Sequence, residues 1–529
     1  MNKASVRLRH GSPTFPAGKD SKMPSPVSVT PALLRKYSQV FPVGSAGTRH
    51  PARLIERRKA HLRALDSFAV FSGVDREPGS EHLWIMSGLR IFQEPALIHL
   101  TGINQPKVIL ALDPRGKSKE VLFISRKDPQ KEFWDGVRLG YPQDPTPEGK
   151  RDLEELRALT GIRDVRPIEQ FQDFFRALVK ASSKPYGYGF YHAYPSDAPA
   201  TGAPTAAGDK AAARSSRAAG AKKIVRTKTD YNWAFKETLE KLAKSSRPKG
   251  FEIRSCVDMH FRLRLPLEPE QIKDAEIAVR HTGEAFKETL AAMPTFGNEN
   301  ELSAFLEWGM RKRSAAGLSF PNIVAAGRNA TVLHYLKNDE PIPAGCMVLM
   351  DFGVRYGTMH ADITRTVPVD GTFNPLQALL YGIVLDANKE NQKNAGPGET
   401  IRNLNRKVWT FLESELQARF FDLGGKAERS YSGQPHGVSH LMGEQEHDGD
   451  PHRLYQDQPL RPGWQISNEP GLYGHFSITL DGKKYSEWIG IRIEDDLLIT
   501  TKGCRNLCAD VPKEIAELEV LLSKSPRPR

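Results

Sequence analysis

Two carboxylates lie on neighbouring strand-like segments near the middle of the chain. Asp351 is in the apolar run VLMDFGV, and Asp362 follows in MHADITRTV after a turn at Tyr356-Gly357. A hairpin centred on that turn places Asp351 opposite Asp362, within one pairing position, and facing Cβ atoms are about 5 Å apart. Two carboxylates that close repel each other, so the pattern predicts a cation between them or a proton on one of them. In the alternative interpretation, both aspartates only cap turns.

The second half of the chain repeats this arrangement with two glutamates. Glu469 is in ISNEPGLY, and Glu494 is in IGIRIEDD, where strand alternation places it on the same face as Arg492. A glutamate between isoleucines on a central strand is costly unless it is paired or binds a metal. A plain buried ion pair with Arg492 is the competing interpretation.

Histidines lie between the two glutamates and the two aspartates, in the segment HGVSHLMGEQEHD. His436 and His440 are four residues apart, and His447 follows; the glutamate of the HExxH zinc motif is absent. The four carboxylates carry four negative charges, which two divalent ions would balance with a neutral His440 as a nitrogen ligand. Oxygen-rich ligands with one imidazole favour Mn²⁺-like ions. Such a pair of ions can hold a bridging hydroxide for attack on a carbonyl.

Two similar halves are expected to position these residues. From about residue 250, the apolar spacing predicts helices before the first pair of strands, at Gln271–Met293 and Asn300–Arg313. It predicts two more before the second pair, at Leu376–Asn391 and Thr400–Leu416. Two helices followed by antiparallel strands, twice over, indicate an α+β domain whose halves pack around one shared sheet, with the site between them.

A smaller α/β unit is predicted over residues 51–200. Its helices are expected at Arg53–Leu65, Asp152–Leu159 and Phe171–Lys180. Its strands are expected at Ala96–Thr101, Val108–Leu112 and Glu120–Ile124.

The net charge of +12 is concentrated in two segments. Residues 1–50 carry +7 and residues 201–223 carry +4, which leaves +1 for the other 456 residues. Both segments are rich in Pro, Ser, Ala and Gly, a composition typical of disorder. The rest of the chain is nearly neutral, so we expect no specific nucleic-acid partner and only weak contact through the tail.

Composition also bears on the compartment. No apolar run approaches the roughly 18 residues of a membrane span, and MNKASVRLRHGSPTF lacks the apolar core of a secretory signal. Four cysteines are too few for a disulfide scaffold. We therefore expect a cytoplasmic protein with no membrane partner.

A resemblance to a known family adds to these arguments. The chain resembles the M24 metallopeptidases of the pita-bread fold over residues 255–510, through PNIVAAGRNATVLHY, VLMDFGVRYGTMHADITRT, PHGVSHLMG, ISNEPGLY and IGIRIEDD. Within them it looks most like aminopeptidase P, whose N-terminal domain is resembled by LIHLTGINQPKVILALDP and LFISRKDPQKEFWDGVRLG.

The resemblance implies five metal ligands. They match the family position by position: Asp351, Asp362, His440, Glu469 and Glu494. Asp362 and Glu494 would bridge two ions, His440 and Glu469 would hold one of them, and Asp351 the other. Glu469 would also handle the proton of the attacking water.

The same resemblance implies a substrate side. His334, His436 and His447 match the family's substrate-side histidines, and His334 and His447 would also stabilise the developing oxyanion. Arg492 completes the expected substrate-binding set. Other histidines, such as His99, are interpreted as structural or surface residues.

These expectations define one enzyme. It would be a dinuclear aminopeptidase that hydrolyses the N-terminal Xaa-Pro bond, with Mn²⁺, or Co²⁺ or Zn²⁺ instead, and it would form a homo-oligomer. The alternatives are an Xaa-Pro dipeptidase (prolidase) and a non-catalytic pita-bread binding module. The expected segments are a disordered tail (1–50), an aminopeptidase-P-like N-terminal domain (51–200), a linker (201–225), a helical connector (226–254), the pita-bread domain (255–515) and a C-terminal tail (516–529).

Overall fold

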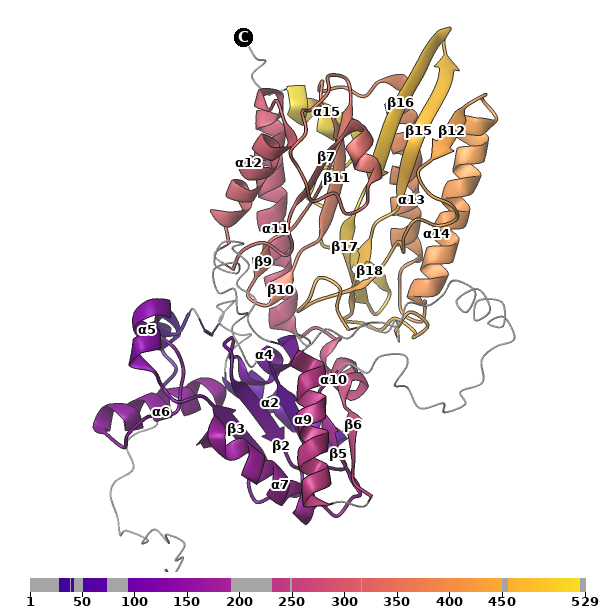
Figure 1. Ribbon diagram of the computed structural model, residues 1–529. Coiled ribbons are helices and arrows are strands. Elements are labelled where there is room, and N and C mark those ends of the chain that lie inside the picture. Colours follow the sequence, from indigo (N-terminus) through magenta and orange to yellow (C-terminus); the bar gives the residue numbers. More distant parts are fainter. Residues whose placement is uncertain are drawn as a thin grey trace, which may run out of the picture.

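The structure is a computed structural model of the chain. It describes residues 28–38, 40–41, 51–73, 94–191, 231–247, 250–314, 316–449 and 455–523. Figure 1 shows a smaller N-terminal body below a larger one that carries the C-terminal half. The predicted linker (201–225) lies outside the described residues.

The smaller body is built on one mixed sheet of six strands, in the order β4-β3-β2-β1-β5-β6. The strands are β1 (Ala69–Ser72), β2 (Val108–Leu112), β3 (Glu120–Ile124), β4 (Asp164–Pro167), β5 (Tyr186–Gly189) and β6 (Glu252–Ser255). Helices α2 (Pro51–Ala64), α4 (Pro95–Thr101) and α6 (Pro147–Thr160) contribute to the core on one face, and α7 (Phe171–Ala181) and α9 (Tyr231–Ser246) to the core on the other. Apolar residues on both sides of the strands explain their continuous hydrophobic runs.

Two features of this body correct the sequence-based predictions. Residues Ala96–Thr101, predicted as a strand, belong to helix α4, which has Pro95 in its first turn and is capped by Gly102 with φ 76°. The predicted helical connector contains α9, but it ends in β6, which pairs in parallel with β5. The connector is therefore part of the N-terminal sheet.

Part of the predicted disordered tail is also folded. Residues Pro31–Lys36 form α1, whose N-cap Thr30 accepts a hydrogen bond from the Leu33 N–H at 3.2 Å. Tyr37 and Phe41 are fully buried in the N-terminal core. The charge count favoured disorder here, but the apolar spacing of VTPALLRKYSQVF provides a face that can pack.

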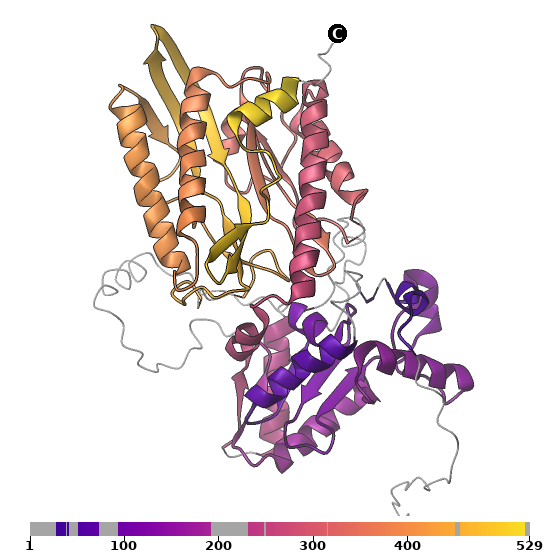
Figure 2. The same ribbon diagram turned by 180° about the vertical axis from the view of Figure 1, so that it is seen from behind.

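The larger body has two halves with the predicted helices. The first half contains α11 (Pro269–Ala292), α12 (Glu299–Arg311), β7 (Ile323–Ala326), β8 (Met347–Phe352) and β11 (Ile363–Pro368). The second contains α13 (Pro375–Asn394), α14 (Ile401–Leu416), β14 (Gln465–Asn468), β15 (Gly471–Leu480), β16 (Lys483–Arg492) and β17 (Asp495–Thr500). In Figure 2, the long helices of both halves lie in front of the strands.

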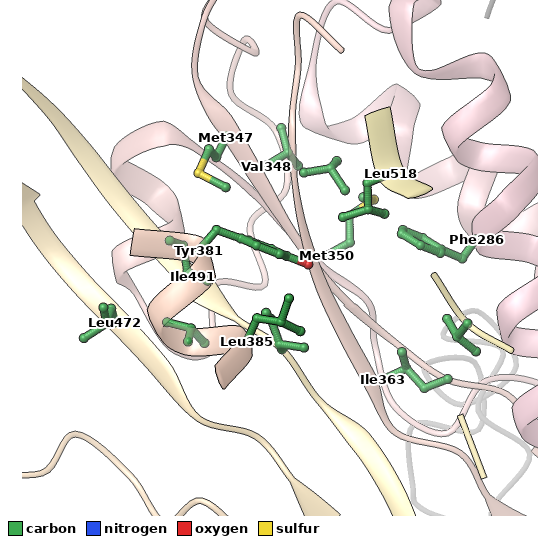
Figure 3. Close-up of a cluster of buried hydrophobic side chains, with 14 of the residues drawn as sticks. Phe286, Met347, Val348, Met350, Ile363, Tyr381, Leu385, Leu472, Ile491 and Leu518 are labelled. Atoms are coloured by element: carbon green, nitrogen blue, oxygen red, sulfur yellow. The ribbon is translucent and has the colours of Figure 1, made fainter. Parts of the chain in front are cut away.

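The two halves share one hydrophobic core. Figure 3 shows Phe286 of α11 and Met350 of β8 in the same cluster as Tyr381 of α13 and Ile491 of β16. Leu518 of the C-terminal helix α15 (Ile515–Ser523) joins them, so the predicted C-terminal tail is folded up to residue 523. The Glu494 N–H donates to the Thr364 C=O at 3.0 Å, which links the strands of the two halves directly.

The hairpin that carries the two aspartates is present with a different register. Asp351 of β8 faces Thr364 of β11, not Asp362. The reason is the turn: Tyr356 pairs with Met359, so the turn is centred on Gly357 and Thr358, one position later than predicted, and Gly357 has φ 62°. A shift of the partner by two residues keeps the side chain on the same face of the sheet.

Candidate metal centre

The five expected ligands lie at strand ends where the two halves meet. Asp351 is in β8, and Asp362 immediately precedes β11. In the second half, His440 immediately precedes β13 (Leu441–Met442), and Glu469 follows β14. Glu494 lies in the short connection between β16 and β17.

Their side chains converge on one space. The His440 Nε2 atom is 3.6 Å from Asp362 Oδ2, 3.5 Å from Glu469 Oε1 and 4.0 Å from Glu494 Oε1. Ligand atoms of Asp362, His440 and Glu494 all lie within 4.8 Å of one another, and no other such group of three was found among the described residues. Atoms at this separation are too far apart for hydrogen bonds and suitably placed to surround an ion.

Too few positive charges lie near the carboxylates of this centre to balance them. Burial, and then repulsion by Asp351, raises the pKa of Asp362 well above its ordinary value. Burial, and then repulsion by Asp362, raises the pKa of Glu494 well above its ordinary value. The Oδ1 atom of Asp351 is buried without a hydrogen-bond partner. These oxygens therefore fit divalent cations, which would replace the protons and satisfy the unpaired atom.

Arg492 is the nearest built-in cation, and its main partner is Asp351. Its Nη2 atom donates to Asp351 Oδ2 at 2.6 Å, whereas its Nε atom is 4.0 Å from Glu494 Oε2. Thr364 lies between them: its hydroxyl donates to Glu494 at 2.7 Å and accepts from Arg492 at 3.0 Å. A single arginine cannot neutralise the four carboxylates, so a plain ion pair does not explain Glu494.

The three histidines that were expected on the substrate side lie around the same centre. His447 is exposed over 65% of its side chain, and its ring centre is 4.1 Å from that of His440. The His436 Nε2 atom is 2.9 Å from the Tyr473 hydroxyl, and its Nδ1 atom is 3.7 Å from Glu469. His334 is exposed, and it lowers the pKa of His436 slightly, after the larger effect of burial.

Three nearby residues were not singled out from the sequence. The Tyr473 hydroxyl accepts a long hydrogen bond of 3.4 Å from Arg492 and lies 2.9 Å from His436 Nε2, so it connects these two side chains. Thr364 was not selected because the predicted register paired Asp351 with Asp362 and not with Thr364. Glu446 lies 3.5 Å from His447, and burial raises its pKa to about 7. An acidic residue next to a motif histidine was the only sequence feature that could have drawn attention to it.

Family models match both bodies of the chain. The model described as metallopeptidase family M24 matches residues 273–501. The model described as aminopeptidase P, N-terminal domain, matches residues 54–186. Among the described residues, no helix combines the length and apolar character needed to cross a membrane.

Individual proteins are similar over most of the chain. Xaa-Pro aminopeptidase 3 of Rattus norvegicus is 32% identical over 447 residues, covering 82% of this chain and 77% of that protein. Xaa-Pro aminopeptidase of Haemophilus influenzae is 28% identical over 441 residues, covering 82% and 88%. The solved structure of aminopeptidase P from E. coli with the inhibitor Pro-Leu has a TM-score of 0.67 and 25% identity, covering 89% of this chain and 98% of that one.

Proposed function

The chain belongs to metallopeptidase family M24, in its aminopeptidase P group, and we propose that it removes the first residue of peptides through a site that holds two divalent ions. It is a metal-dependent hydrolase of N-terminal Xaa-Pro bonds. The observation that carries the two-ion proposal is the charge of the centre. Three carboxylates lie within 4.0 Å of His440, Asp351 adds a fourth, and among the described residues Arg492 is the cation paired with it.

The residues that would hold the ions are Asp351, Asp362, His440, Glu469 and Glu494. Carboxylate oxygens with one imidazole favour Mn²⁺ over metals that prefer sulfur, and Co²⁺ or Zn²⁺ are the alternatives. When bound, the ions would supply a hydroxide at neutral pH and polarise the peptide carbonyl.

The protein's own groups would position the peptide and move the proton. Glu469 is half-buried, with Oε1 3.5 Å from His440, so it can accept the proton of the attacking water. His447 and His334 are exposed beside the centre and can donate to the carbonyl oxygen as negative charge develops on it. His436 is held by Tyr473 at 2.9 Å on the substrate side. Arg492 contacts Asp351, so its effect on substrate binding would be coupled to that ligand.

A peptide panel tests the proposed specificity. The Mn²⁺-loaded protein should release arginine from Arg-Pro-Pro and leave Arg-Ala-Pro intact, with products identified by mass spectrometry. Glu469→Gln keeps the shape of the side chain but cannot take a proton, so it is the matched inactive control. Cleavage confined to Xaa-Pro dipeptides would instead identify a prolidase, and cleavage of Arg-Ala-Pro would refute the proline requirement.

Two further aspects of this proposal concern the protein in the cell. The cysteine count led us to expect a cytoplasmic location, and we keep that as a proposal that imaging of the full-length chain would test. A homo-oligomer is proposed on the family resemblance alone, and light scattering of the purified chain would measure its mass.

A further inference from the structure

The segment that follows His440 folds into a compact loop, residues 441–448. The Asp448 N–H donates to the Leu441 C=O at 2.8 Å, which closes the loop. The Asp448 carboxylate then accepts from the Glu444 N–H at 3.1 Å. Gly443 is required beneath it, because a Cβ there would lie 2.7 Å from Asp448 Oδ2. The loop is therefore built around the Asp448 side chain, and His447 is the adjacent residue.

Arg264, which is not part of this loop, binds two of its acidic side chains. It is the last residue of α10 (Val257–Arg264), and α10 lies where the two bodies meet (Figure 1). Its guanidinium donates to Glu444 Oε2 at 3.2 Å and to Asp448 Oδ1. Arg264 is 2% exposed, Asp448 4% and Glu444 6%. Charges this deeply buried persist only when they are paired, so the three side chains act as a unit.

The unit extends into both bodies. Gln271 of α11 donates to Glu444 Oε1 at 2.8 Å. His99 of α4, in the N-terminal body, has its Nδ1 atom 3.1 Å from the same oxygen. On the other side, the His360 N–H donates to the Gly443 C=O at 3.1 Å, two residues before the ligand Asp362. The loop thus joins the N-terminal body to the strands of the metal centre.

We propose that Arg264 is a positioning residue: by holding Glu444 and Asp448 it fixes the loop that places His447 beside the metal centre. The proposal rests on the proposed function, because it assumes that His447 contacts the peptide. Arg264 itself is buried behind the loop and would act on substrate only through His447. The N-terminal body, through His99, would thereby help to set the geometry of the reaction.

A second arginine at the same junction provides the matched control. Arg57 of α2 is 7% exposed, pairs with Glu268 at 2.8 Å and donates to the His99 C=O at 3.1 Å. It is a buried, paired arginine like Arg264, but its partners, Glu268 and the backbone C=O of His99, lie outside the 441–448 loop. Arg57→Gln and Arg264→Gln therefore disturb the junction similarly and differ in their connection to His447.

A double-mutant cycle separates positioning from general stability. Arg264→Gln should lower kcat/KM for Arg-Pro-Pro by about 20-fold or more in the otherwise unchanged protein. In the His447→Ala background it should lower kcat/KM by less than about 3-fold, because the effects of residues that act as a unit are not additive. Arg57→Gln should change kcat/KM by less than about 3-fold in both backgrounds. If Arg264→Gln lowered kcat/KM by the same factor in the two backgrounds, the proposal would be overturned.

Hydrogen exchange of the metal-free chain provides a readout that does not depend on turnover. The amides of Glu444 and Asp448 should exchange faster in Arg264→Gln and in the isosteric Asp448→Asn, and at the unchanged rate in Arg57→Gln. If Arg264→Gln does not fold, Asp448→Asn replaces it in both experiments. If the loop amides exchange unchanged in every variant, the positioning role is wrong. If exchange responds but the unmodified protein cleaves no Xaa-Pro peptide, the proposed function fails while the loop contact stands.

Discussion

Two buried acidic clusters meet at consecutive residues of this chain. The protein's own cations balance the negative charge of one cluster, but they do not balance that of the other. Asp495 is fully buried, with Arg365 at 2.8 Å and Lys513 also in contact. Burial alone would raise its pKa, but attraction to these two cations lowers it below the ordinary value. Glu494, one residue earlier, belongs to the metal centre, where burial and Asp362 raise its pKa.

The difference between the clusters separates stability from function. Glu494 lies just before β17 and Asp495 is its first residue, yet Glu494 contacts Thr364 and Asp495 contacts Arg365, so neighbouring residues of similar chemistry enter different environments. The Asp495 cluster carries its own cations and needs nothing from outside. The centre around Glu494 has an excess of negative charge, which the chain can relieve only by binding protons or metal ions.

The largest effect on stability is expected from breaking the balanced cluster. Asp495→Asn leaves Arg365, which is fully buried, without its carboxylate partner. Removing one member of a buried ion pair costs about 3–5 kcal/mol of unfolding free energy. Urea denaturation of the metal-free variant would measure this loss, and an unchanged midpoint would mean that Asp495 is not part of a balanced pair.

Breaking the unbalanced centre should instead cost activity. Asp362→Asn keeps the shape, removes one negative charge and weakens one of the proposed ligands. It should therefore reduce kcat/KM by more than about a hundredfold, or about 3 kcal/mol of transition-state stabilisation. The same urea experiment on the metal-free variant should show stability that is unchanged or higher, because carboxylate repulsion is relieved. Near-normal turnover and metal content would make Asp362 an ordinary turn residue.

The pH dependence of the stability of the metal-free protein should reveal the same excess of negative charge, with a smaller effect than either substitution. Because the pKa values of Asp362 and Glu494 are raised in the folded state, folding binds protons, and that stabilisation is complete only below the ordinary carboxyl pKa of about 4. It is lost as the pH rises through the raised values. The melting temperature of chelator-treated protein should therefore fall as the pH rises above about 5, and added Mn²⁺ should restore it. A melting temperature that rises over this range would contradict the raised pKa values.

The smallest effect is expected from truncation of the N-terminal segment. Removing residues 1–27 should leave turnover within about threefold, or under about 0.7 kcal/mol. Removing residues 1–45 also deletes Tyr37 and Phe41, which are fully buried in the N-terminal core, so this longer truncation should lower the melting temperature. Equal melting temperatures for the two truncations would show that α1 contributes nothing to that core.

The sequence selected residues that the fold brings close together, and it said less about the residues that surround them. Carboxylates inside apolar strands are anomalous in any local pattern, which is why Asp351, Asp362 and Glu494 could be selected before the fold was known. The register of their hairpin depended on a turn centre that differed by one position, and a local pattern does not determine this. Arg264 and Glu444 are 180 residues apart in the chain. Their contact exists only in the folded chain, so no spacing rule could have paired them.

Metal analysis of the active protein tests the central claim most directly, namely that the excess charge around His440 is balanced by two ions. Elemental analysis of protein purified to constant specific activity should give about two divalent ions per chain, from the four carboxylates and the two charges of each ion. A chelator should abolish Arg-Pro-Pro cleavage, and Mn²⁺ should restore it. Full activity from protein that contains no bound metal would contradict the account.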